Sequence, residues 1–135
     1  MEFITWRDSY SVKVPSIDEQ HQKLVSLINH LYNKFYEGLD KNDLENLFGE
    51  LEQYAVYHFS YEERFMKLYG YKDLQEHQEE HESFKEKIAE YKQNLDPGNT
   101  TYIIDLVNFL KDWLLKHIMG TDRKYSELFQ QKGLK

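Results

Sequence analysis

Residues 16–38 read SIDEQHQKLVSLINHLYNKFYEG, and their apolar side chains recur every three or four positions. This spacing is the period of an α-helix with one buried face. Ser16 to Glu19 match a capping box, which predicts the start of the helix, and Gly38 predicts its end. The apolar stripe consists of Ile17, Leu24, Ile28, Leu31 and Phe35.

The helical period continues through most of the remaining chain. It predicts a second helix that ends around Gly70, a third over about 71–95, and a fourth that is broken by Gly120. Residues 96–99, DPGN, are a strong turn signal, and a short last helix is expected over about 122–131. We therefore predict an all-α fold, an antiparallel up-down-up-down four-helix bundle with an N-terminal arm and a short C-terminal helix.

Length and composition limit the class of protein. With 135 residues, of which 40% are apolar, the chain suits a single domain over 1–135. The formal charge of -7 argues against nucleic acid or an anionic membrane surface as a partner. There is no apolar segment of signal-peptide or membrane-spanning length, so we expect a cytoplasmic protein.

Polar residues interrupt the apolar stripes of all four long helices. They are His21, His58, Glu62, His77, His81 and His117. One buried histidine is usually bonded to a backbone carbonyl or a tyrosine. Burying six unpaired polar groups, at about 1–3 kcal/mol each, would cost as much as the whole stability of a small domain. A shared metal is the simplest partner for all of them, and with no cysteine in the chain its ligands must be His, Asp and Glu.

The predicted topology allows these side chains to meet. An antiparallel bundle places the starts of the first and third helices beside the ends of the second and fourth. At about 1.5 Å rise per residue, all six fall within roughly 15 Å of the same end. Asp122, just beyond Gly120, can turn its carboxylate toward that layer or act as the N-cap of the last helix.

The number of ligands favours two metal ions. Five imidazoles and two carboxylates exceed the four ligands of a closed zinc site. Glu62 and Asp122 are then the natural bridges, and nitrogen-rich ligation favours iron over magnesium or calcium. Zinc or manganese could also occupy such a site.

These residues and their spacing resemble the hemerythrin family, and the single-domain bacterial members in particular. All seven ligand positions match, together with IDEQHQ at 17–22, HF at 58–59, EE at 62–63, GY at 70–71, WLLKHI at 113–118 and Tyr125. The match covers about 6–125, nearly the whole chain.

The resemblance implies reversible dioxygen binding for oxygen transport or storage, without enzymatic turnover. Its cofactor would be two iron ions bridged by Glu62, Asp122 and an oxo or hydroxo group. His77, His81 and His117 would saturate one iron, while His21 and His58 would leave the other an open position. A sensor of oxygen or redox state, or a scavenger of oxygen, peroxide or nitric oxide, is the alternative. The oligomeric state stays open, and a monomer is one expectation.

Apolar neighbours of the ligands suggest a pocket that excludes water and anions. Leu114 lies one turn before His117 and matches a pocket leucine of the family. The other pocket candidates are Leu24, Ile28, Phe59, Trp113 and Ile118. For Phe59, Ile118 and Ile28, ordinary core packing is an equally good explanation.

Two enzyme classes compete with this interpretation. HQEEH at 77–81 matches the H-x-x-E-H pattern of a zinc peptidase with Glu80 as general base. This hypothesis leaves the three other inward histidines, His21, His58 and His117, unexplained. Glu80 is more simply a surface charge. Ferritin-like di-iron oxidases use paired Glu-x-x-His motifs, and none occurs in this chain. His30 lies off the stripe and is expected at the surface.

Overall fold

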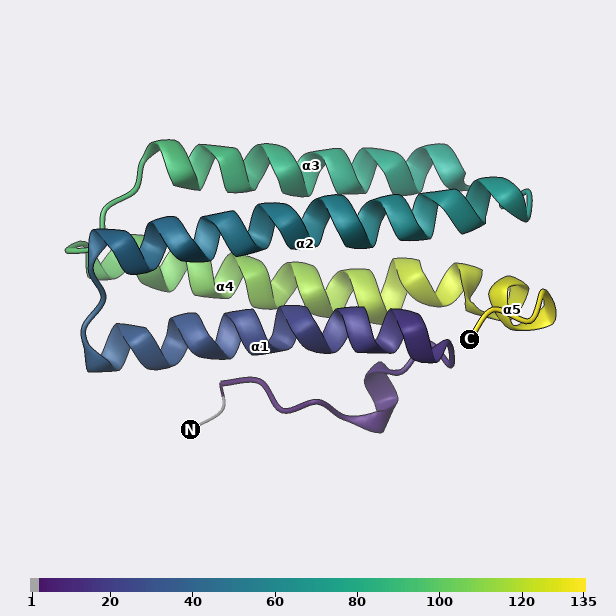
Figure 1. Cartoon of the computed structure of the whole chain (residues 1–135), viewed down its shortest axis with the longest axis horizontal. Coiled ribbons are helices and arrows are strands. Elements are labelled where there is room, and N and C mark those ends of the chain that lie inside the picture. Colours follow the sequence, from purple (N-terminus) through teal and green to yellow (C-terminus); the bar gives the residue numbers. More distant parts are fainter. Residues whose placement is uncertain (1–2) are drawn as a thin grey trace.

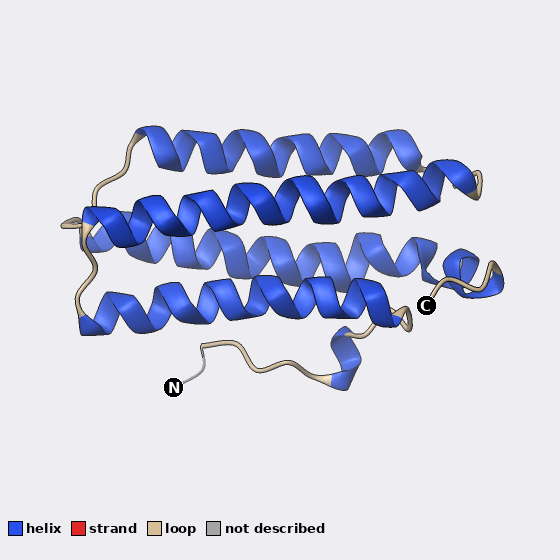
Figure 2. Cartoon of the chain, in the orientation of Figure 1, coloured by secondary structure: helices blue, strands red, loops and turns tan. Residues whose placement is uncertain are grey.

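A computed structural model describes residues 3–135, except for the side chains of Ile118, Met119 and Thr121. Its four long helices are α1 (Pro15–Glu37), α2 (Lys41–Leu68), α3 (Leu74–Gln93) and α4 (Thr100–Lys116). Successive helices run in opposite directions side by side, as Figure 1 shows. No strand occurs among the described residues (Figure 2). The predicted all-α four-helix bundle is confirmed.

The beginning of α1 differs from the prediction. The helix starts at Pro15, and no side chain caps it. Asp18 lies within the four residues of the expected capping box. It accepts hydrogen bonds from the Val12 amide, at 2.8 Å, and the Ser11 hydroxyl, at 2.5 Å. Its carboxylate thus holds the N-terminal arm. The capping box of this protein lies at α2, where Asp40 and Asp43 each accept from the other's backbone amide.

The N-terminal arm lies along α1 (Figure 1). Ile4, Val12 and Val14 are buried in the core. Asn29 of α1 binds the arm on both sides, because its side chain accepts from the Phe3 and Ile4 amides and donates to the Ile4 carbonyl. The arm therefore packs along one side of α1, and Phe3 also reaches α4, where Lys111 lies over its ring at 5.0 Å.

The end of the bundle where α1 begins is closed by the C-terminal segment. A π-helical turn (His117–Asp122) follows α4 directly and leads into α5 (Arg123–Gln131). Tyr125 and Phe129 of α5 are fully buried, and Phe129 packs edge-on against Tyr69 at 5.6 Å between ring centroids. Figure 1 shows α5 folded against this end. Among the described residues, no helix is long and apolar enough to cross a bilayer.

Candidate metal centre

Helices α1, α2 and α3 and the turn after α4 each contribute buried polar side chains to the closed end of the bundle. His21 comes from α1, His58 and Glu62 from α2, and His77 and His81 from α3. His117 and Asp122 begin and end the π-helical turn. All seven are at most 3% exposed. The structure thus brings together every residue that the sequence predicts as a metal ligand, while His30 is exposed, as expected.

The π-helical turn explains how Asp122 reaches the cluster. An i→i+5 turn places residues five apart on one face, and such turns occur often at functional sites. Asp122 occupies the N-cap position of α5, but its side chain makes no capping hydrogen bond there. Its Oδ1 lies 2.9 Å from His117 Nε2 and 3.0 Å from His77 Nε2. Its Oδ2 lies 2.7 Å from His21 Nε2.

Glu62 spans the cluster in the same manner. Its Oε1 lies 2.8 Å from His58 Nε2, 3.4 Å from His81 Nε2 and 3.5 Å from His117 Nε2. Its Oε2 accepts a hydrogen bond from the Tyr125 hydroxyl. Each carboxylate therefore contacts histidines from more than one helix.

The donor atoms form two groups that share one carboxylate. His77, His81, His117 and Glu62 have ligand atoms within 4.8 Å of one another, and so do His21, His58, Glu62 and Asp122. We call these the three-histidine group and the two-histidine group. Because Asp122 also contacts two imidazoles of the three-histidine group, both carboxylates lie between the groups. This is the arrangement expected for two neighbouring cations.

Unpartnered polar atoms show that the cluster suits a cation. Among the ligand atoms of these two groups, six are buried and make no hydrogen bond with any described residue: Nε2 of His21, His58, His81 and His117, Oε1 of Glu62, and Oδ2 of Asp122. Buried polar atoms without a partner are rare and costly. All six can donate a lone pair, and imidazole with carboxylate is a common ligand set for iron and zinc. Bound cations would satisfy every one of them.

Opposite charges shift the ionisation of the cluster. Burial alone would raise the pKa of Glu62, but the facing imidazoles, led by His58, hold that pKa well below its usual value. Burial would lower the pKa of His77, yet Asp122 and Glu62 raise it to about 9. The same two carboxylates raise the pKa of His117, whereas burial lowers the pKa of His58. Without metal, the carboxylates are ionised and His77 and His117 hold protons, which a metal must displace.

A second layer of polar residues lies behind the imidazoles, and sequence reasoning missed it. His58 Nδ1 lies 2.6 Å from Gln20 Oε1, and His81 Nδ1 lies 2.9 Å from Glu63 Oε2. His117 Nδ1 lies 3.6 Å from Glu80 Oε2, so Glu80 is more than the plain surface charge we expected. A partial signal was present, since Gln20 and Glu63 each adjoin a predicted ligand in the sequence.

The predicted pocket residues fall into two sets. Leu24, Ile28, Phe59 and Leu114 are completely buried, and the Phe59 ring stacks on His81 with centroids 3.9 Å apart. Trp113 is half-buried and stacks on His117 at 4.2 Å, beside a surface pocket that also includes Glu80. The side chain of Ile118 lies outside the described residues.

The fold and the cluster together define a four-helix bundle with a buried metal-binding centre at one end. Comparison with known proteins agrees, because residues 12–129 match the family described as Hemerythrin HHE cation binding domain. This chain belongs to the hemerythrin family.

Its relatives match over most of their length. A bacteriohemerythrin of Clostridium acetobutylicum is 35% identical over 126 residues, which covers 89% of this chain and 96% of the relative. A bacteriohemerythrin of Methylococcus capsulatus is 28% identical, with 93% and 95% coverage. A solved structure of a hemerythrin mutant superposes with a TM-score of 0.83 at 26% identity, covering 95% of this chain and 98% of that one.

Proposed function

We propose that this protein binds dioxygen reversibly at a pair of iron ions and serves oxygen transport or storage. His77, His81 and His117 would hold one ion, His21 and His58 would hold the other, and Glu62, Asp122 and an oxo or hydroxo group would bridge the two. The observation that carries the proposal is that Glu62 and Asp122 each contact imidazoles of both groups. The relatives' name, bacteriohemerythrin, supports the same function.

The unequal histidine count supports a binding position on one side only. Three imidazoles serve one group and two serve the other, while both carboxylates are shared. An exogenous ligand would therefore bind on the side of His21 and His58. When bound, the two ferrous ions supply the electrons that dioxygen binding requires, which side chains alone cannot provide.

The remaining side chains favour binding over further reaction. Leu24, Phe59 and Leu114 are fully buried, so they exclude water and anions from this end of the bundle. Burial raises the pKa of the phenols of Tyr54 and Tyr125, so both retain their protons at neutral pH. Neither phenol is a ready proton donor for reduction of a bound ligand.

Anaerobic ferrous reconstitution, followed by exposure to air, tests the function. We expect two irons per chain and a visible absorption band that appears in air and disappears under nitrogen over repeated cycles. Loss of the oxygenated form should be slow. Irreversible oxidation within seconds would contradict the carrier function and favour a redox sensor or a scavenging enzyme.

A further inference from the structure

Gln20 is the polar residue behind His58, and its chemistry is restricted. Its Oε1 atom can only accept a hydrogen bond, so the 2.6 Å contact is a hydrogen bond when His58 Nδ1 carries a proton. That proton on Nδ1 leaves His58 Nε2, which lies 2.8 Å from Glu62 Oε1, able to give its lone pair to a metal ion. Both Gln20 and His58 are buried, at 8% and 0% exposure, so bulk water does not compete freely for this bond.

The two groups differ in the charge behind their imidazoles. In the three-histidine group, Glu63 lies behind His81 and Glu80 behind His117, and both are carboxylates. In the two-histidine group, the acceptor behind His58 is a neutral amide. No described residue accepts from His21 Nδ1, which is buried. Among the described side chains that contact the outer ring nitrogens, the carboxylates therefore lie behind the three-histidine group.

We propose that Gln20 is a positioning residue that fixes the ring of His58 and keeps the two-histidine group the less electron-rich of the two metal positions. An acceptor behind a ligand imidazole sets its tautomer, and a carboxylate there makes the imidazole a stronger donor. A neutral acceptor leaves the donor weaker, which favours ferrous over ferric iron. This inference rests on the proposed function, because it assigns a role within the two-ion centre.

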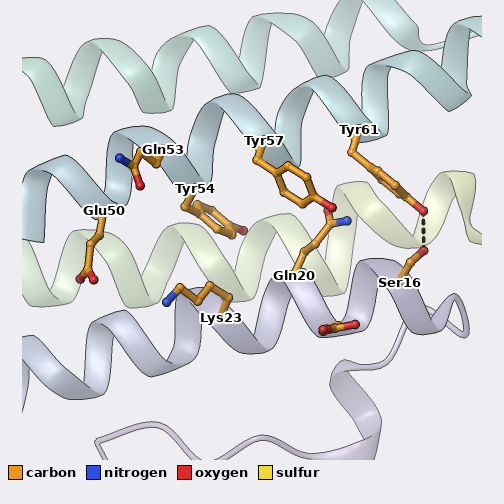
Figure 3. Close-up of a pocket in the computed structure, with 9 residues that line it drawn as sticks. Ser16, Gln20, Lys23, Glu50, Gln53, Tyr54, Tyr57 and Tyr61 are labelled. Atoms are coloured by element: carbon orange, nitrogen blue, oxygen red, sulfur yellow. Dashed lines mark hydrogen bonds between the residues drawn. The ribbon is translucent and has the colours of Figure 1, made fainter.

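Gln20 can be substituted without altering any of the seven predicted ligands. It lines a surface pocket of about 570 Å³ between α1 and α2, together with Lys23, Tyr54 and Tyr57. Figure 3 shows its side chain extending from α1 toward α2 across this pocket. A substitution here alters the polarity behind His58 while all seven ligands stay in place.

The first test uses the metal-free protein. Nitrogen NMR of the His58 ring at neutral pH should show a preference for protonation at Nδ1 in the wild type. Gln20→Leu, which removes the acceptor at similar size, should abolish this preference, and Gln20→Glu should retain it. Gln53→Leu is the matched control, because Gln53 is an exposed residue of the same pocket. An unchanged His58 tautomer in Gln20→Leu would overturn the proposal.

The second test loads the site. Titration with Zn²⁺ should show that Gln20→Leu lowers the affinity for one of the two ions by roughly 10–100-fold. This is the usual effect of losing the hydrogen-bond partner of a ligand imidazole. In the iron-loaded protein, Gln20→Glu should lower the reduction potential. Equal ion affinities in wild type and Gln20→Leu, or an unchanged potential in Gln20→Glu, would contradict the proposal. A wild type that binds fewer than two ions would refute the proposed function instead, and the metal-free NMR result would still decide the role of Gln20.

Discussion

The Nε2 atom of His21 lies 2.7 Å from the Oδ2 atom of Asp122, and both side chains are fully buried. His21 belongs to the first turns of α1, and Asp122 ends the π-helical turn after α4. The contact thus joins the first long helix to the turn that follows the fourth. It requires the complete bundle, so the metal centre and the fold should depend on each other.

Loss of one ligand should prevent loading of the pair. We expect His77→Ala or Glu62→Ala to hold at most one iron per chain after anaerobic reconstitution, measured by elemental analysis. Glu62 contributes to both groups, so its loss affects both ions. His30→Ala, at an exposed histidine outside the cluster, should still hold two irons. Two irons and oxygen binding in either ligand variant would refute the assignment.

Stability of the metal-free protein should be greatest near pH 6.5. The raised pKa values of His77, about 9, and His117 stabilise the fold below the unfolded value of about 6.5, and this contribution is lost as pH rises toward 9. The lowered pKa of His58 acts in the opposite sense, since it destabilises the fold as pH falls below about 6.5. The lowered pKa of Glu62 adds a further loss below about pH 4.

Urea unfolding across this pH range measures the effect. Bound metal should remove the loss on the alkaline side, because coordinated imidazoles are already deprotonated. A metal-free protein whose stability does not change between pH 6.5 and 9 would show that His77 and His117 hold no protons there.

Leu114→Ala should weaken both the core and the barrier around the centre. Leu114 is fully buried, and removing a buried leucine side chain costs about 2–5 kcal/mol in unfolding free energy. The cavity should admit water and anions, so the oxygenated form should be lost faster. Leu110→Ala, one turn earlier and equally buried, should be similarly unstable with a smaller effect on that rate. Equal rates in the two variants would show that Leu114 is core packing only.

Two buried tyrosines should respond differently to removal of the hydroxyl group. The Tyr125 hydroxyl donates to Glu62 Oε2, whereas the Tyr54 hydroxyl makes no hydrogen bond with any described residue. Tyr125→Phe should cost about 1–3 kcal/mol, because it leaves a buried carboxylate oxygen without its donor. Tyr54→Phe should be close to neutral. Unfolding of the two metal-free variants makes the comparison, and a cost in Tyr54→Phe as large as in Tyr125→Phe would contradict the prediction.

Much of this centre was predictable because six of the seven predicted ligands are polar residues on otherwise apolar stripes. His21, for example, lies on the stripe of α1 between Ile17 and Leu24, and all three are completely buried. The helical period alone places such a residue inside the bundle, and the antiparallel order places it at one end. The bundle and the convergence of these six side chains follow from these two facts, whereas Asp122 reaches the cluster through the π-helical turn.

The features that the sequence did not predict depend on which of several possible partners a side chain binds. Ser16 and Glu19 fit a capping box, but the helix begins at Pro15 and the Ser16 hydroxyl instead accepts a hydrogen bond from Tyr61, which a sequence pattern does not reveal. Gln20 and Glu80 are polar residues off the stripes, and only the orientation of the imidazoles makes them partners. The π-helical turn contains one more residue per turn than an α-helix. From the sequence, Gly120 predicted only that the helix is broken there, and not this turn.

Diffraction from crystals of the iron-reconstituted protein, measured at the iron absorption edge, tests the central claim most directly. Two anomalous peaks are expected inside the closed end of the bundle, one beside His77, His81 and His117 and the other beside His21 and His58, with Glu62 and Asp122 between them. A single peak, or iron bound outside these seven side chains, would contradict the account.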